Sequence, residues 1–256
     1  MRFATWNVNS LKARLPRIEE FLGYADVDVL CLQETKCSDK TFPALTFSGL
    51  GYESVHYGQG QWNGVAVLSR KGIDSADHGF GDGYDDPYVG DARLLVVRTA
   101  GIDFVSVYVP NGRAVGTDTF TAKLAFLDAM GPHVAAIDVL GGDMNVCPAD
   151  DDVYDPAAFA GETHVTPDER ERLAAVVAAG MVDAYRAFAP GVQQFTWWDY
   201  RQGHFHRGFG LRIDLLLVKA ALAPGIENVG IDRNFRKGPK PSDHAPLLMD
   251  LTLPGA

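Results

Sequence analysis

Residues 93–109 read RLLVVRTAGIDFVSVYV, and this stretch decides the class of fold. It contains two apolar runs of strand length, 93–98 and 103–109, with only a short turn around Gly101 between them. Two strands joined by so short a turn pair antiparallel, because a parallel pair needs a crossover of about a dozen residues or more. The sheet that holds these strands is therefore not the purely parallel sheet of a doubly wound fold.

Further apolar runs of strand length recur on both sides of this pair. They span residues 3–8, 27–32, 64–68, 137–140, 213–218 and 245–251. Several of them show little alternation of polar and apolar residues, which is typical of strands covered on both faces. We therefore expect sheets that are buried between other layers.

Helical patterns lie between some of these runs. Residues 15–22 place apolar side chains on one face, and Gly23 follows as the expected stop. The clearest start is Thr166-Pro-Asp-Glu169, a capping box with proline at the first helical position. That helix should end at Gly180. The mixture of strands and helices predicts an α/β protein with mixed sheets.

The composition is that of a globular chain, with 256 residues of which 46% are apolar. No low-complexity linker interrupts the chain, so we expect one domain over residues 1–256. No apolar run approaches the roughly 18 residues that a membrane helix needs. The first residues already follow a strand pattern, so we expect no signal peptide and a cytoplasmic protein. Three cysteines without paired spacing argue against a disulfide framework or a zinc site.

The formal net charge of −10 argues at first against a nucleic-acid partner, because phosphate contacts need lysine and arginine. The charges are clustered, however. Acidic residues gather at 82–86 and 150–155, and basic residues gather at 12–17 and 233–240. A local basic face on an acidic protein therefore stays open, although the 233–240 cluster could equally be an ordinary solvated loop.

Polar side chains gather where the expected strands begin or end. In an antiparallel arrangement the start of one strand lies beside the end of its neighbour, so we expect these clusters to meet at one edge. The clusters are Asn7 with Asn9, Glu34 with Lys36, Tyr108 with Asn111 and Arg113, Asp143 with Asn145, Arg212 with Asp214, and Asp243 with His244.

The chemistry of such an edge can be narrowed by residue type. Carboxylate and amide oxygens favour a hard cation, Mg²⁺ or Mn²⁺. The sequence has no nucleophilic serine or cysteine beside a base, no Walker loop and no dinucleotide fingerprint. An oxygen-ligated cation with a His–Asp pair suits attack of water on a phosphodiester. Taken singly, Glu34 could also be a surface carboxylate, Asp214 an edge ion pair and Tyr108 a core ring.

Seven segments together resemble the exonuclease III and abasic-endonuclease family of the endonuclease/exonuclease/phosphatase superfamily. The Ser-Asp-His and Gly-Asp-x-Asn elements are shared with pancreatic deoxyribonuclease, sphingomyelinases and inositol phosphatases, whereas Gln-Glu-Thr-Lys and Tyr-x-Pro-Asn are narrower. The segments occur in family order and span nearly the whole chain: Trp6-Asn7-Val-Asn9, Leu32-Gln-Glu34-Thr-Lys36, Tyr108-Val-Pro-Asn111, Gly142-Asp-Met-Asn145, Trp198-Asp-Tyr200-Arg201, Gly210-Leu-Arg-Ile-Asp214 and Ser242-Asp-His-Ala-Pro246.

The resemblance implies a four-layer α/β sandwich, in which two mixed, mostly antiparallel sheets pack face to face with helices on the outside. It also implies a Mg²⁺-dependent DNA-repair nuclease, with Mn²⁺ as a substitute. The activities implied are those of a 3′→5′ exodeoxyribonuclease and an abasic-site endonuclease, with 3′-phosphatase activity. Double-stranded DNA, especially at abasic sites and 3′ ends, is then the expected partner of a monomeric protein.

The resemblance assigns metal binding first to Glu34. Some family members carry a carboxylate where this chain has Asn9, so metal affinity here should depend more on Glu34. The helping ligands, and those of a second metal position, would be Asn7, Asp143, Asn145, Asp243 and His244.

The resemblance also assigns catalytic roles. Asp143 would act on the attacking water or the leaving oxygen. His244, oriented by Asp214, would touch the scissile phosphate or serve as base. Asn145 and Tyr108 would stabilise the negative charge of the transition state.

DNA contacts are expected on both sides of this centre. A shallow apolar pocket that accepts a sugar without a base is placed by the resemblance around Trp197, Leu211 and Ile213. The alternative for Trp197 is ordinary core packing. The remaining contacts to DNA are expected from Lys36, Asn111, Arg113 and Arg212.

Two other functions stay open from the sequence. One is a phosphodiesterase or phosphatase of the same fold that acts on a lipid or inositol phosphate, which the acidic net charge would suit. The other is a DNA-binding scaffold that has kept the fold without catalysis. Loss of a site residue would mark such a relic, and none of the expected site residues is missing.

Overall fold

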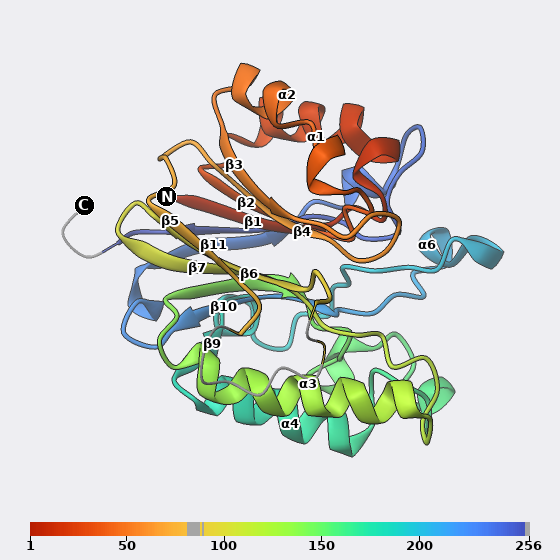
Figure 1. Cartoon of the computed structure of the whole chain (residues 1–256). Helices are drawn as coiled ribbons and strands as arrows, with labels where there is room; N and C mark the ends of the chain where they lie inside the picture. Colours follow the sequence, from red (N-terminus) through yellow and green to blue (C-terminus); the bar gives the residue numbers. More distant parts are fainter. Residues whose placement is uncertain (81–87, 89, 254–256) are drawn as a thin grey trace.

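The computed structural model describes residues 1–80, 88 and 90–253, which form two six-stranded sheets packed face to face (Figure 1). The acidic cluster expected at 82–86 lies outside the described residues. The first sheet has the order β11 (Ile226–Ile231), β12 (Leu247–Leu251), β1 (Arg2–Asn7), β2 (Val29–Gln33), β4 (Val65–Ser69), β3 (Glu53–Tyr57). The second has the order β5 (Ser75–His78), β6 (Leu94–Thr99), β7 (Ile102–Tyr108), β8 (Val139–Asp143), β10 (Asp214–Lys219), β9 (Met181–Asp183).

Each sheet contains one parallel pair, β1–β2 and β7–β8, and its other neighbouring strands are antiparallel. The antiparallel pairing of β6 with β7 confirms the prediction from residues 93–109. Ala100 and Gly101 connect the two strands, both with positive φ, at 51° and 79°. Positive φ at both central residues is the geometry that a tight hairpin requires.

Helices cover the outer faces of both sheets (Figure 1). The two long helices α3 and α4 lie together under the second sheet, whereas α1 and α2 lie over the first. The α-helices are α1 (Leu11–Ala25), α2 (Ala44–Gly49), α3 (Asp118–Val134), α4 (Pro167–Ala178), α5 (Ala184–Phe188) and α6 (His204–Arg207). Short 3₁₀ helices are η1 (Asp39–Thr41), η2 (Asp150–Asp152), η3 (Pro156–Phe159), η4 (Arg201–Gly203), η5 (Ala223–Gly225) and η6 (Arg233–Arg236).

Three apolar layers hold these elements together. Phe3, Val67 and Phe104 belong to the core between the sheets. A second core lies between the first sheet and its helices, and a third lies between the second sheet, α3 and α4. The predicted four-layer α/β sandwich is therefore confirmed. None of the helices in the described ranges is both long and apolar enough to cross a membrane.

The helix boundaries agree with the sequence in one case and differ in another. The capping box of Thr166 and Glu169 is formed, and α4 ends before Gly180 as expected. The predicted stop at Gly23 is wrong, because α1 continues to Ala25 and ends at Asp26, a residue with φ of 50°. Ala25 is buried, so the apolar face of the helix extends past the glycine.

The first sheet draws its strands from both ends of the chain. β12 pairs with β1 and β11, and the amino group of Met1 donates to the Leu251 carbonyl at 2.7 Å. The second sheet is built from the continuous middle of the chain. The strands that carry the polar clusters begin or end at one common edge of the two sheets.

Candidate active site

The polar clusters meet where strands of both sheets end. In the second sheet, Asp143 is the register partner of both Tyr108 and Asp214. In the first sheet, β1 and β2 run parallel, so Asn7 and the segment containing Glu34 reach the same edge. The expected convergence of the polar clusters at one edge is confirmed by the contacts below.

The side-chain amide of Asn7 joins the two sheets at this edge. Its Nδ2 donates to Glu34 Oε1 at 2.8 Å and to Asp143 Oδ2 at 2.9 Å. The close approach of the sheets depends on Gly141, where a methyl group would lie 3.2 Å from the Cβ of Thr5. One buried amide therefore holds together two carboxylates that would otherwise repel each other.

The imidazole of His244 is fixed between two carboxylates. Its Nδ1 lies 2.8 Å from Asp214 Oδ2, and its Nε2 lies 3.8 Å from Asp143 Oδ2. The backbone N–H of His244 donates to the Ser242 hydroxyl at 3.2 Å. The ring is buried, with Nδ1 facing Asp214 and Nε2 facing Asp143.

These charges change the protonation of the pair. Burial raises the pKa of Asp143 to about 7, and the neighbouring charges of Asp214 and Glu34 act in the same direction. Burial alone would lower the pKa of His244, but Asp214 and Asp143 outweigh it and raise that pKa to about 10. At neutral pH the histidine is an imidazolium, and Asp143 is poised to exchange a proton.

Tyr108 and Asn145 add neutral donors. Burial raises the pKa of Tyr108 well above its usual range, and the charges of Glu34 and Asp143 raise it further, so the phenol keeps its proton. Asn145 Nδ2 donates to the Val109 carbonyl at 2.9 Å and to Asp143 Oδ2 at 3.3 Å, and its Oδ1 accepts a hydrogen bond from Asn111 Nδ2 at 3.1 Å. Donors of this kind can stabilise negative charge on a phosphoryl oxygen.

Three side chains could enclose one metal ion. Ligand atoms of Glu34, Asp143 and His244 lie within 4.8 Å of one another. Two of them are carboxylate oxygens, the ligand type of Mg²⁺, so the donor set fits a hard cation. Mg²⁺ prefers oxygen to imidazole nitrogen, and Asp214 already engages Nδ1 of His244. The two carboxylates are therefore the stronger ligand candidates.

The other expected ligands are oriented differently. Asn7 Oδ1 accepts the backbone N–H of Asn9 at 3.0 Å, and its N–H groups face the carboxylates. The Asn145 oxygen is likewise occupied, by Asn111. Asp243 lies outside the three-residue group. The structure thus brings these residues to the site without turning their oxygens toward a shared cation.

Asp243 belongs to an adjoining network. Its carboxylate accepts hydrogen bonds from Asn9 Nδ2 at 3.0 Å and from Trp197 Nε1 at 3.1 Å. Lys36 Nζ donates to Asn9 Oδ1 at 2.5 Å and pairs with Glu34 at 2.7 Å. The neutral Asn9 therefore connects Asp243 to the lysine beside Glu34.

Several site residues adopt a left-handed backbone, which non-glycine residues rarely do. They include Asn9 (φ 44°), Glu34 (52°), Lys36 (50°), Arg113 (56°) and Asn145 (50°). Each such residue costs of order 1–3 kcal/mol, and such strain concentrates at functional sites. The backbone conformation that places these side chains in the site therefore reduces local stability.

Trp197, Leu211 and Ile213 pack together, as the sequence predicts. Leu211 and Ile213 are buried, whereas Trp197 is half-buried and directs its indole N–H to Asp243. The backbones of Trp197 and His244 form a β-bridge, and the indole N–H reaches Asp243, the residue that precedes His244. Its role as a pocket wall stays a prediction.

The prediction that Arg212 contacts DNA is wrong. Its guanidinium is fully buried, with Nε donating to Asp152 Oδ1 at 2.6 Å and Nη2 to Asp183 Oδ2 at 2.7 Å. Four of its five N–H donors bind these two carboxylates, and the side chain exposes no surface that a phosphate could reach. Arg212 instead ties the start of β10 to β9 and η2.

The basic cluster at 233–240 also differs from expectation at one position. Arg236 is buried, and its guanidinium lies over the rings of Tyr200 and Phe205, at 5.3 Å and 5.1 Å from their centroids. It therefore serves the fold rather than an open basic face. The exposed cations of the cluster are Arg233, Lys237 and Lys240.

The sequence alone did not identify Lys123, which packs beneath the site. Its Nζ donates to the backbone carbonyls of Asn145 at 2.7 Å and Asn111 at 3.2 Å, and forms an ion pair with Glu169. Both members of the pair are fully buried. The capping box marked Glu169, but no local pattern marked the lysine. Its contacts hold two asparagine backbones of the site in place.

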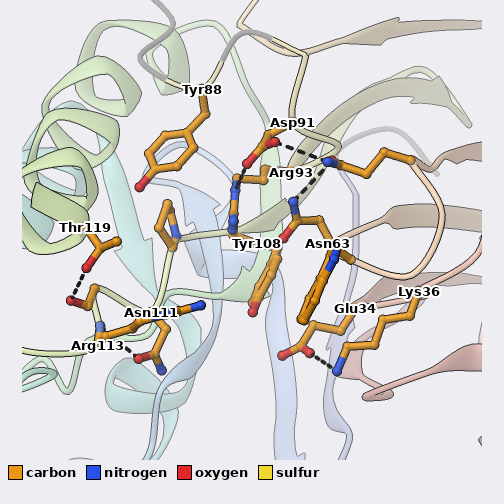
Figure 2. Close-up of a pocket in the computed structure, with 14 residues that line it drawn as sticks. Glu34, Lys36, Asn63, Tyr88, Asp91, Arg93, Tyr108, Asn111, Arg113 and Thr119 are labelled. Atoms are coloured by element: carbon orange, nitrogen blue, oxygen red, sulfur yellow. Dashed lines mark hydrogen bonds and ion pairs between the residues drawn. The ribbon is translucent and has the colours of Figure 1, made fainter.

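A cleft of ≈ 420 Å³ opens beside Glu34 and Tyr108 (Figure 2). Lys36, Asn111 and Arg113, which the sequence predicts to contact DNA, all line it. Trp62 lines it as well, and no motif in the sequence singled out that residue.

Comparisons with known proteins agree with this architecture. Exodeoxyribonuclease III from Haemophilus influenzae is 30% identical over 266 residues, covering 96% of this chain and 98% of that protein. The solved structure of the 3′ phosphatase NExo from Neisseria, bound to a product DNA hairpin, matches with a TM-score of 0.95 and 34% identity over 99% of this chain and 100% of that one. An AP endonuclease from Archaeoglobus fulgidus matches with a TM-score of 0.94 and 32% identity, again over 99% and 100%. Residues 4–244 match the Endonuclease/Exonuclease/phosphatase family, and the chain belongs to that family.

Proposed function

We propose that this protein is a Mg²⁺-dependent DNA-repair nuclease that hydrolyses phosphodiesters of double-stranded DNA. It would act as a 3′→5′ exodeoxyribonuclease and an abasic-site endonuclease, and would remove 3′ phosphates. The observation that carries the proposal is the meeting of Glu34, Asp143 and His244 at the joint between the sheets. The relatives support DNA as the substrate, because they are named as an exodeoxyribonuclease, a DNA-bound 3′ phosphatase and an AP endonuclease.

The site residues divide the work of hydrolysis. Glu34, with Asp143 beside it, would hold the cation, which when bound supplies Lewis-acid polarisation of the phosphate and neutralises charge. Asp143, whose carboxylate lies 3.8 Å from His244 Nε2, accepts a proton from water as the water oxygen attacks phosphorus. The His244 imidazolium, held by Asp214, donates to a phosphate oxygen.

Neutral donors complete the site. The Tyr108 hydroxyl and the Asn145 amide stabilise the extra negative charge on the phosphoryl group as the bond to the leaving oxygen breaks. Lys36 pairs with Glu34, so its charge offsets the carboxylate when no cation is present. DNA binding by an acidic chain would rely on exposed cations, such as Arg113 in the cleft and Lys237 in the 233–240 cluster.

Three end-labelled duplexes test the proposal. One has an unmodified 3′ end, one carries a single abasic analogue and one ends in a 3′ phosphate. With Mg²⁺ or Mn²⁺ all three should be hydrolysed, and a chelator should stop the reaction. Asp143→Asn should bind the same duplexes but turn over about 10²–10⁴-fold more slowly.

The alternative outcomes are distinct. Hydrolysis that persists in chelator would contradict the metal assignment. Binding without hydrolysis by the wild-type protein would favour a DNA-binding scaffold. Hydrolysis of inositol phosphates or phospholipids, with the duplexes left intact, would favour the other substrate class of this fold.

A further inference from the structure

The cleft beside Glu34 is separate from the place where Trp197 lies. Glu34 and Tyr108 line the cleft, whereas Trp197, Asp243 and His244 do not. Trp197 instead pairs with His244. The cleft therefore lies beside the reaction centre but on a different side from Trp197 (Figure 2). Its volume of ≈ 420 Å³ lies in the range of about 300–1,000 Å³ that is typical of ligand sites.

The loop that carries Trp62 is fixed to the segment that carries Glu34. The backbone N–H of Lys36 donates to the Asn63 carbonyl at 2.9 Å, and that of Thr35 to the Gly64 carbonyl at 3.1 Å. Gly64 has a φ of 95°, and a methyl group there would lie 2.0 Å from the Thr35 hydroxyl. Only glycine allows this contact, so the position of Trp62 is set relative to the candidate metal ligand.

Trp62 does not serve the core. Its side chain is 65% exposed, whereas Trp6 and Trp198 are fully buried. What sets Trp62 apart from the other exposed apolar side chains is its place in the lining of the cleft that also holds Glu34 and Tyr108. Aromatic side chains beside nucleic-acid sites offer a face on which a base stacks, whatever its sequence.

The charges of the cleft suit a nucleotide. Lys36, Arg93 and Arg113 line it together with Glu34 and Asp91. Among the described residues that line the cleft, three cations thus face two carboxylates, although the chain as a whole has a net charge of −10. This local excess favours an anionic ligand.

The two arginines of the cleft differ in whether their guanidinium groups already have a carboxylate partner. Arg93 is held by Asp91 at 3.0 Å and lies over the Tyr108 ring, 5.0 Å from its centroid. Arg113 is exposed and forms no ion pair with any residue in the ranges 1–80, 88 and 90–253. Its backbone N–H donates to Asn111 Oδ1 at 3.1 Å, which fixes the turn that presents it. Arg113 therefore offers a guanidinium for a phosphate.

We propose that this cleft is a nucleotide subsite, in which the base of a nucleotide next to the scissile phosphate stacks on Trp62 and a backbone phosphate contacts Arg113. The proposal rests on the function proposed above, since it needs a nucleic-acid substrate. The subsite would give the protein a second contact with the DNA strand, separate from the one predicted at Trp197. Recognition by stacking would tolerate any base at this position.

Fluorescence of 2-aminopurine, a base analogue that loses emission when it stacks, tests the contact directly. The analogue is placed on either side of the scissile phosphate of a duplex hairpin, in an Asp143→Asn background that slows hydrolysis. Binding should quench the analogue at one of the two positions. Adding Trp62→Ala should remove the quenching, whereas Trp62→Phe, which keeps a ring, should retain most of it.

Steady-state kinetics in the wild-type background give the second readout. Trp62→Ala should raise KM about 10-fold, the size of one lost stacking contact, with kcat changed less than about threefold. Leu45→Ala is the matched control, because Leu45 is equally apolar, 89% exposed and outside the cleft. It should leave both constants unchanged.

The results separate this inference from the proposed function. Hydrolysis by the wild type, with Trp62→Ala indistinguishable from Leu45→Ala, would overturn the subsite alone. Quenching at neither position, or quenching that survives Trp62→Ala, would also overturn it. A wild-type protein that hydrolyses no DNA would overturn the proposed function and this inference with it.

Discussion

Replacing Lys123 with methionine should destabilise the protein and slow its reaction. Lys123 Nζ contacts the carbonyls of Asn111 and Asn145, the Thr163 hydroxyl and the Glu169 carboxylate. Because both members of the ion pair are fully buried, removal of the cation leaves Glu169 as an uncompensated charge. Breaking such a pair costs about 3–5 kcal/mol. In a chain of this size that corresponds to a fall in Tm of roughly 6–20 °C.

A double-mutant cycle with Glu169→Gln separates the two effects. The double variant has no charge in this site, so denaturant unfolding should show recovery of about 2 kcal/mol or more relative to additive losses. Its turnover should still stay about 10-fold low, because the carbonyls of Asn111 and Asn145 lack their donor. Additive losses of stability would refute the buried-pair argument. Wild-type turnover in the double variant would refute a positioning role for Lys123.

Four further outcomes are expected. Glu34→Gln should raise the Mg²⁺ concentration for half-maximal activity at least about tenfold, with Tm unchanged, and an unaltered titration would remove Glu34 as a ligand. Metal affinity, measured by calorimetry, should increase with pH up to about 7 and then level off. The reason is that the Asp143 carboxyl, whose pKa is raised to about 7, must lose its proton before it binds metal. A flat profile between about pH 5.5 and 8 would contradict the raised pKa of Asp143. Trp197→Ala should keep Tm and reduce abasic incision much more than 3′ resection, whereas a uniform loss with about 3–5 kcal/mol of destabilisation would assign the indole to the core. DNA affinity should fall steeply with salt, and Lys237→Glu with Lys240→Glu should reduce the log–log slope by about 0.9 per lost phosphate contact, whereas a salt-independent affinity would favour a lipid or inositol phosphate.

The fold could be predicted where local patterns are strong. The hairpin of β6 and β7 and the capped start of α4 both follow from residues close in sequence. β5 could not be found in this way, because all four of its residues are exposed and carry no apolar pattern. The end of α1 was misjudged because burial of Ala25 outweighs the helix-breaking tendency of Gly23.

The sequence predicted which residues form the site, but not the orientation of every side chain. Polar residues at strand ends marked Asp143 and His244, and the sheets bring them together. The partners of Arg212 lie 60 and 29 residues away, at Asp152 and Asp183, so its burial could not be read from its neighbours. Contacts between residues so far apart in the sequence depend on the topology of the whole fold rather than on local propensity.

The sharing of the first sheet between the two ends of the chain has a consequence for biosynthesis. β12 lies between β1 and β11, and His244 precedes it by only a few residues. Until residues 244–251 have left the ribosome, the growing polypeptide lacks both the His244 imidazole and the strand that completes the first sheet around β1. Nuclease activity should therefore appear only after His244 and β12 have left the ribosome and β12 has paired with β1.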